Sequence, residues 1–142
     1  MAALAALALS GCSGTGVQAV TAAPTAPASA GPSKAVVAVA RNKPQLLEVV
    51  RRFNDQGCAY GRSGETCSTD TVALGRLAGA MRMDLDGSKP WSPEVADLAG
   101  QTASRLASVE VLLEDRTGME SVLDTELVQL ERDLQSWSAY GG

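Results

Sequence analysis

The sequence predicts an all-α fold, a small up-and-down bundle of three to four helices that follows a disordered tether. Three observations support this prediction. Between residues 42 and 138, apolar side chains recur at the spacings of three and four that place them on one side of a helix. Almost no stretch of that region alternates polar and apolar residues as strands do. Residues 13–33 are uncharged and rich in Ala, Thr, Ser, Pro and Gly, so they cannot bury enough apolar surface to fold.

The first helix is predicted to run from Asn42 to Gln56. Asn42 can cap its first turn, Pro44 is tolerated where the amides have no partner, and Gly57 can adopt the left-handed conformation that ends helices. The preceding run, Ala35 to Ala40, fits either a strand or a helical turn, and the helix is favoured. The apolar residues on the inward side of this helix are Leu46, Leu47, Val50 and Phe53.

A second helix is predicted to begin at Ser68 or Asp70 and to end at Asp86, with Gly87 as its stop. Its inward side carries Leu74, Leu77, Met81 and Leu85. The stretch from Asp84 to Gly87 matches the opening of a calcium loop, but the acidic ligands that such a loop needs further on are missing. We therefore predict a helix end here and no metal site.

A third helix is predicted to start at Ser92, which can cap it, with Pro93 and Glu94 in its first turn. The inward phase then continues to the C-terminal region, interrupted only by Arg116 and Glu120. One rod of about 70 Å would fit this phase, but we predict a hairpin broken near Gly118, because glycine weakens helix interiors and Thr117 to Glu120 has capping-box spacing. The inward positions are Val95, Ala99, Thr102, Leu106, Val109, Leu113, Leu123, Leu127, Leu130, Leu134 and Trp137.

The N-terminal residues carry a different kind of motif. An apolar run from Ala2 to Ala8 leads into Leu9-Ser10-Gly11-Cys12. This stretch resembles the lipobox of bacterial lipoproteins, in which a peptidase cuts before the cysteine and the thiol carries a diacylglycerol. The resemblance implies a signal peptide over residues 1–11 and lipidation of Cys12. Residues 12–33 would then tether a helical domain of residues 34–142 to the extracytoplasmic face of the cell membrane. The alternative is an Ala-rich N-terminal helix that ends in a small-residue turn with one cysteine.

Cys58 and Cys67 flank a Gly-rich loop between the first two predicted helices. In an oxidising compartment two cysteines in this arrangement are expected to pair, which leaves Cys12 for the lipid. Closing such a loop contributes about 2–3 kcal/mol in the chain-entropy model. The bridge would hold Tyr60, Arg62 and Glu65 on a rigid loop, and we predict these three residues as a possible interaction surface.

No catalytic or metal-binding constellation is found in the sequence, and no cofactor is expected. The chain has no histidine, so Ser63 in the Gly-rich loop has no base of that kind to take its proton. Two cysteines without histidine make a poor zinc site. The many carboxylates of the last two helices lie mostly off the inward phase, which is typical of a solvated face. We therefore predict that the protein is not an enzyme.

Charge is distributed unevenly along a chain whose formal net charge is −4. Residues 34–93 carry 9 basic and 6 acidic residues, whereas Glu94 and the residues after it include 3 basic and 10 acidic ones. The basic first half is expected to pack against the acidic second half. Alternatively, basic residues near the anchor contact anionic lipid headgroups, namely Lys34, Arg41, Lys43, Arg51 and Arg52. An acidic chain without a basic stripe argues against nucleic acid as a partner.

These observations predict a lipid-anchored, non-enzymatic interaction or structural module that presents a surface to a cell-envelope protein. The expected contact surfaces are the disulfide loop and the acidic face of the last two helices. The alternative is an extracytoplasmic carrier or sensor that binds a small molecule between helices. In that case the small inward residues Ala99 and Thr102 would leave a cavity, and acidic positions near Glu120 would face it. A carboxylate-dependent hydrolase of envelope glycans is a remoter alternative.

Overall fold

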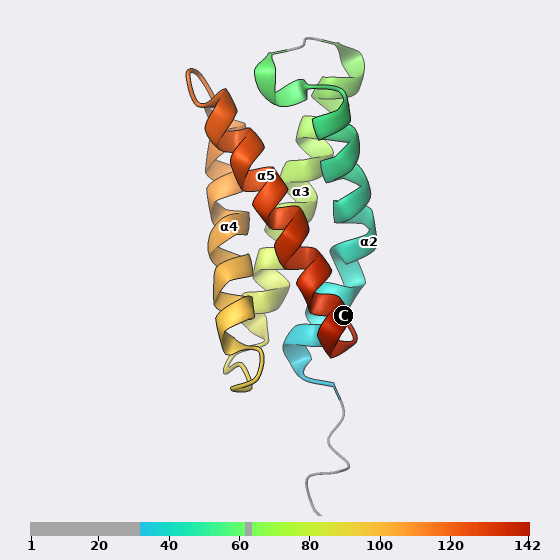
Figure 1. The fold of residues 1–142 in the computed structure, drawn as a ribbon, viewed down its shortest axis with the longest axis vertical. Coiled ribbons are helices and arrows are strands. Elements are labelled where there is room, and N and C mark those ends of the chain that lie inside the picture. The colour runs from blue at the N-terminus through green and yellow to red at the C-terminus, as the bar shows by residue number, and fades with distance from the viewer. Residues whose placement is uncertain (1–31, 62–63) are drawn as a thin grey trace, which may run out of the picture. The chain divides into compact units, whose positions relative to one another are not determined.

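The structure is a computed structural model, and it describes residues 32–61 and 64–142. These residues form four long α-helices and two short 3-10 helices (Figure 1). The long helices are α2 (Lys34–Asp55), α3 (Glu65–Gly87), α4 (Ala96–Glu114) and α5 (Glu120–Ser136), and the short ones are η3 (Cys58–Tyr60) and η4 (Trp137–Tyr140). Each long helix packs on the next, and α5 closes the bundle against α2. The prediction of an all-α, up-and-down bundle is therefore confirmed.

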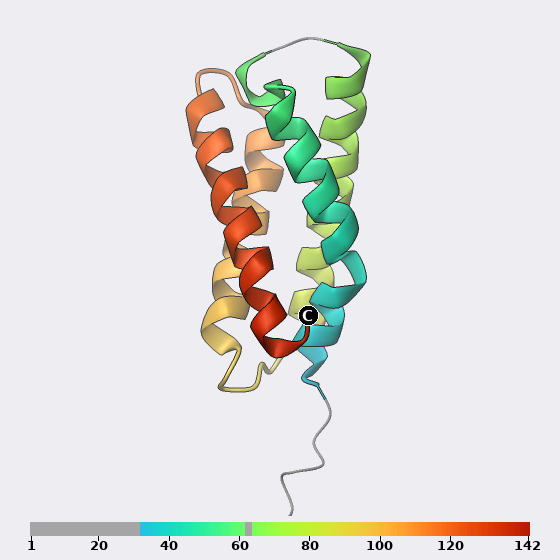
Figure 2. The ribbon, with the colours of Figure 1, turned by 45° about the vertical axis from the view of Figure 1, so that its right-hand side comes forward.

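The bundle has two ends, which the turned view separates clearly (Figure 2). The connection between α2 and α3 and the connection between α4 and α5 lie together at one end, which we call the distal pole. The start of α2, the connection between α3 and α4, and η4 lie at the other end, the entry pole. None of the helices in the described part of the chain is both long enough and apolar enough to cross a membrane.

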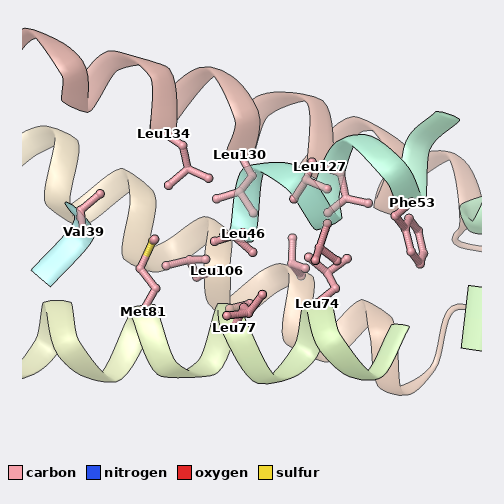
Figure 3. Packing of buried hydrophobic residues seen from close by; sticks show 14 of the residues in the cluster. Val39, Leu46, Phe53, Leu74, Leu77, Met81, Leu106, Leu127, Leu130 and Leu134 are labelled. Atoms are coloured by element: carbon pink, nitrogen blue, oxygen red, sulfur yellow. The ribbon is translucent and has the colours of Figure 1, made fainter. Parts of the chain in front are cut away.

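Leucine, valine and methionine side chains from all four helices fill the centre of the bundle (Figure 3). Leu46, Leu106 and Leu130 are fully buried there, as predicted. In α4 the buried residue near the C-terminal end is Leu112 rather than Leu113, which is only partly buried. Trp137 is also fully buried. The helical spacing in the sequence was informative because most of the leucines at predicted inward positions lie together in this core.

Helix α2 begins eight residues earlier than predicted, at Lys34 instead of Asn42. Ser33 caps it, because its Oγ accepts a hydrogen bond of 3.3 Å from the amide of Val36. The run from Ala35 to Val39 buries most of its side chains in the core, and this burial outweighs the cost of a proline inside the helix. Pro44 itself is exposed, as is Ala40, whose carbonyl would have accepted the missing hydrogen bond, so water can reach it. With this extension α2 has 22 residues, more than the predicted range of Asn42 to Gln56.

Helix α3 also begins earlier than predicted, at Glu65, with Gly64 rather than Ser68 or Asp70 before its first turn. Asp70 does not cap the helix. Its carboxylate is buried and accepts hydrogen bonds from Nε and Nη2 of Arg52 at 2.7–3.0 Å. At the other end, α3 includes Gly87, which was predicted to follow the helix as its stop, and Gly87 does not have a positive φ.

Helix α4 begins at Ala96, later than the predicted start at Ser92. Residues 93–95 form a turn in which the amide of Val95 donates to the carbonyl of Ser92 at 3.1 Å. The Oγ of Ser92 is buried and caps nothing. Pro93 and Glu94 therefore form a turn before the helix instead of its first turn.

The predicted break near Gly118 is confirmed, because α4 ends at Glu114 and α5 begins at Glu120. Gly118 has a φ of 74°, a left-handed conformation that favours glycine. The predicted capping box is absent, since the side chain of Thr117 does not cap α5. Instead, the carboxylate of Asp115 accepts from the amide of Thr117 at 3.2 Å, and that of Glu120 accepts from the amide of Gly118 at 3.3 Å.

Some of the ion pairs join the basic first half of the domain to the acidic second half, as expected, and others do not. Arg51 pairs with Glu131, and Arg82 pairs with Glu110, so both ion pairs join the two halves. Other ion pairs stay within one half. Arg52 pairs with Glu48 and Asp70 in the first half, and Arg105 pairs with Glu126 and Asp133 in the second.

Candidate functional site

The connection between α2 and α3 forms a tight turn at the distal pole, closed by a disulfide. The Sγ atoms of Cys58 and Cys67 are 1.98 Å apart and their Cα atoms 5.4 Å apart. Gly57 and Gly61, on either side of η3, have φ values of 66° and 78°, which a residue with a side chain rarely adopts. The predicted pair of cysteines is therefore joined, and both are buried.

Two hydrogen bonds connect this turn to the first turns of α5 and to the connection that precedes α5. The hydroxyl of Tyr60 donates to the carboxylate of Asp124 at 3.1 Å, and Arg116 Nη1 donates to the carbonyl of Cys58 at 3.2 Å. The hydrogen bond to Asp124, followed by partial desolvation and the nearby negative charge, raises the pKa of Tyr60 above its ordinary value. The disulfide turn and the start of α5 thus form one connected surface.

Two of the three residues predicted as an interaction surface lie at this pole. Tyr60 is 58% exposed, although its hydroxyl is hydrogen-bonded. Glu65 is exposed at the first residue of α3. Arg62 lies outside the described residues.

Carboxylates without an ion pair to another described residue are concentrated at the same pole. The carboxylates that do form ion pairs lie along the helices or near the entry pole, for example Asp84, Glu110 and Asp133. Two of the remaining carboxylates, Glu94 and Asp97, lie near the entry pole. The others lie at or near the distal pole: Asp55, Glu65, Glu114, Asp115, Glu120 and Asp124. At this pole the six carboxylates outnumber Arg116, the basic residue described in its two connections.

Exposed apolar side chains lie among these carboxylates. Met119, in the connection between α4 and α5, is 42% exposed, and Tyr60 is the most exposed aromatic residue in the described part of the chain. We call the group formed by the six carboxylates with Tyr60 and Met119 the distal surface. It combines negative charge with a small apolar contact area, a combination found where proteins bind basic partners.

The sequence did not identify several residues of the distal surface. Met119 was not singled out, and Asp124 was expected only as one carboxylate of the acidic face of the last two helices. Nothing in the local pattern shows that Tyr60 and Asp124, which are far apart in the sequence, meet at one pole. One signal was present. Arg116 occupies an inward position in the helical phase, and in the structure its side chain reaches across to the carbonyl of Cys58.

The carboxylates of the stretch that resembles the opening of a calcium loop bind neighbouring side chains. Asp84, at the start of the stretch that resembles a calcium loop, accepts from Arg41 and Asn42, and Asp86 pairs with Lys89 at 2.8 Å. Within residues 32–61 and 64–142, no three potential metal-ligating side chains of His, Cys, Asp or Glu come together.

The alternative of a carrier or sensor called for a cavity near Ala99 and Thr102, and in the structure both residues are buried in the packed bundle. Trp137 is fully buried, and its Nε1 donates to Thr102 Oγ1 at 3.0 Å. That hydroxyl in turn donates to the carbonyl of Leu98 at 2.7 Å. Glu120 is partly exposed at the distal pole and binds the amide of Gly118, so it does not face the core.

Trp91 lies at the entry pole and is partly buried. Its Nε1 donates to the carbonyl of Leu85 at 3.0 Å and to Ser88 Oγ at 3.2 Å. The ammonium group of Lys89 lies 4.8 Å from the centre of the indole ring. Trp91 thus fastens the connection between α3 and α4 to the end of α3.

Comparison with known proteins gives no functional assignment: no family model, no curated protein and no solved structure matches the chain.

Proposed function

We propose that this protein is a lipid-anchored, non-enzymatic module of the cell envelope whose distal surface binds a basic segment of another envelope protein. The observation that carries the proposal is the concentration of six carboxylates without ion-pair partners in the described chain around the exposed Tyr60 and Met119. Exposed like charges repel one another, so their concentration at one pole is unfavourable for the isolated domain. Binding of a basic segment would relieve that repulsion.

The disulfide turn supports a binding role because it orders the surface before a partner arrives. Cys58 and Cys67 fix the turn, and the hydrogen bonds of Tyr60 and Arg116 fix its position against α5. A surface that is already ordered loses less conformational entropy on binding. Its negative charge would also increase the rate of encounter with a positively charged partner.

The arrangement of the bundle fits attachment at the opposite end. Helix α2 begins at the entry pole, so a tether that precedes it would join the domain there. The 22 residues of α2 span about 33 Å at 1.5 Å per residue, and the distal surface lies at the far end of that length. With Cys12 as the proposed lipidated residue, the tether would reach the domain at the pole opposite the distal surface.

A titration of the full chain with a Lys/Arg-rich peptide, followed by calorimetry, tests the binding surface. We expect binding that weakens as salt is added and weakens several-fold in the triple variant Asp55→Asn, Glu65→Gln and Asp115→Asn. The control is Glu94→Gln with Asp97→Asn, which removes unpaired carboxylates from the entry pole instead. Equal weakening in both variants, or binding of an acidic peptide with similar affinity, would contradict the proposal.

The anchor is tested by intact mass of the protein purified from its native membrane, with and without reductant. We expect a chain that begins at Cys12 and carries added acyl mass, and a gain of two hydrogens on reduction of the Cys58–Cys67 bridge. A full-length chain without acyl groups would disprove the anchor but would leave the binding experiment valid.

A further inference from the structure

The side of the bundle formed by α3 and α4 differs from the distal surface in character. The three most exposed large apolar side chains in the described part of the chain are Val72 (71%), Met83 (68%) and Val111 (66%). Val72 and Met83 belong to α3, and Val111 belongs to α4, which packs directly against it. We call the outward side of these two helices, around the three residues, the α3–α4 face.

Helical spacing places these residues on one continuous face. Val72, Arg76, Gly79 and Met83 follow one another at intervals of four, three and four along α3, so they share its outward side. On α4, Ser104, Ser108 and Val111 follow one another at intervals of four and three, and all three are exposed. Large apolar residues on this face therefore alternate with glycine and serine.

Two close approaches of α4 side chains to glycines of α3 show which residues of the two helices lie at the same height along the bundle, which we call the same level. A Cβ atom at Gly75 would lie 3.8 Å from Leu113 Cδ1, and one at Gly79 would lie 2.8 Å from Glu110 Oε1. Because the helices are antiparallel, Val111 lies close to the level of Gly79, and Glu114 lies within one turn of the level of Arg76, about 5.4 Å. Arg76 and Glu114 are both exposed, and neither forms an ion pair with another described residue.

We propose that the α3–α4 face binds a second copy of this chain in a parallel dimer with two-fold symmetry. A two-fold axis parallel to the bundle places α3 of one protomer opposite α4 of the other. Each residue then has the same height along the bundle in both protomers. Val111 of each protomer then lies at the level of its partner's Gly79, beside the Glu110 side chain that covers that glycine. Arg76 of each protomer meets the opposite charge at Glu114 of its partner, and both contacts occur twice, as an isologous interface requires.

The self-complementary pattern is the reason for choosing a second copy as the occupant. Two opposite charges without ion-pair partners in the described chain, Arg76 and Glu114, lie at matching levels on the two helices of one face, and the most exposed apolar side chains lie on the same face. An antiparallel two-fold would place α3 against α3 and α4 against α4, which separates Arg76 from Glu114. A lipid surface would leave Ser104, Ser108 and Glu114 without polar partners. The proposal does not depend on the function of the distal surface, with which this face shares only Glu114.

Sedimentation velocity of the full 142-residue chain over a wide range of concentration tests the dimer. We expect a concentration-dependent doubling of mass, which the double variant Met83→Lys and Val111→Lys abolishes. The control is Val122→Lys with Val128→Lys, which adds the same charge at exposed valines of α5. All four side chains are exposed, so circular dichroism is expected to show that both variants fold. A chain that stays monomeric, or a dimer that withstands the first variant, would overturn the proposal.

Charge exchange tests the parallel arrangement. Arg76→Glu and Glu114→Arg are each expected to raise the dimer dissociation constant about tenfold, because each places like charges opposite one another in the dimer. The double exchange is expected to restore most of the lost affinity, since the opposite charges then meet again in reversed order. Additive losses in the double variant would show that Arg76 and Glu114 do not meet, and the parallel dimer would be wrong.

Discussion

At the scale of single residues, the two most informative side chains are polar and lie at sites that the helical pattern does not describe. Asp70 is buried inside the inward phase of α3, where the sequence suggested a helix cap. Its carboxylate holds Arg52 of α2 through two donors, so it joins the first two helices. Tyr60 is exposed at the distal pole and joins the disulfide turn to α5.

The pair formed by Asp70 and Arg52 gives a prediction for stability. Asp70→Ala is expected to lower the free energy of unfolding by about 1–3 kcal/mol, the cost of leaving hydrogen-bonding groups without partners. A fully buried pair would cost more, but the Arg52 side chain is 40% exposed and water can reach its free donors. Urea unfolding measures the change. Glu48→Ala removes the other carboxylate partner of Arg52, which is 74% exposed, and is expected to change stability by less than about 0.5 kcal/mol.

Tyr60 gives a prediction for pH dependence. Its pKa is raised in the folded state by the hydrogen bond to Asp124, so the fold favours the protonated phenol. This contribution to stability is present below the pKa of an unfolded tyrosine, about 10, and is lost as the pH rises through the higher folded value. Absorbance titration of the phenolate is expected to show a step above that value, which moves to lower pH in Asp124→Ala. Tyr60→Phe identifies the step, and an unchanged midpoint in Asp124→Ala would contradict the assignment.

At the scale of elements, the core positions were predictable and the helix starts were not. Leu46, Leu106 and Leu130 repeat at helical spacing, and spacing is a property of the sequence itself. Pro44 lies inside a helix because the Ala and Val side chains that precede it are buried in a core. Without that core, Pro44 could equally begin the helix. That core is formed by helices far along the chain.

The candidate site was predictable only in part for the same reason. Cys58 and Cys67 lie close in sequence, so their pairing followed from local spacing and the expected oxidising compartment. The contacts of Tyr60 with Asp124 and of Arg116 with the Cys58 carbonyl join segments about 60 residues apart. They follow from the way the bundle brings two connections to one pole.

The connection between α4 and α5 gives a prediction for a single glycine. Gly118→Ala is expected to destabilise the protein by about 1–2 kcal/mol, because a side chain disfavours the left-handed conformation with φ of 74°. Gly87→Ala is the control. Gly87 is helical, lacks a positive φ, and would have no atom within 4 Å of a new Cβ. That change is expected to be neutral or stabilising by up to about 1 kcal/mol, and thermal unfolding distinguishes the two outcomes.

At the scale of the whole molecule, the two poles are held together by different means. The distal pole depends on the disulfide and on hydrogen bonds between its two connections. The entry pole depends on packing and hydrogen bonds around Trp91 and on Lys43, which donates to Ser138 at 2.7 Å. Reduction of the disulfide should therefore affect one pole only.

Hydrogen exchange with and without reductant measures this difference between the poles. Reduction is expected to speed amide exchange in residues 57–61 and 116–119, because the turn that Arg116 and Tyr60 contact loses its covalent closure. Exchange in the connection over residues 88–95 is expected to remain unchanged. The Cys58→Ser and Cys67→Ser double variant should behave like the reduced protein. Equal acceleration at both poles would show that the disulfide stabilises the bundle globally.

The even number of long helices has a consequence for chain connectivity. The described chain starts and ends at the entry pole, and a Cβ at Gly142 would lie 3.6 Å from Val36 in the first turn of α2. Lys43 also donates to the carbonyl of Gly142. A short linker could therefore join Gly142 to Ser33 and allow a circular permutant that opens at Gly118. Likewise, a fluorescent reporter fused after Gly142 would emerge beside the entry of the chain and leave the opposite end of the bundle unobstructed.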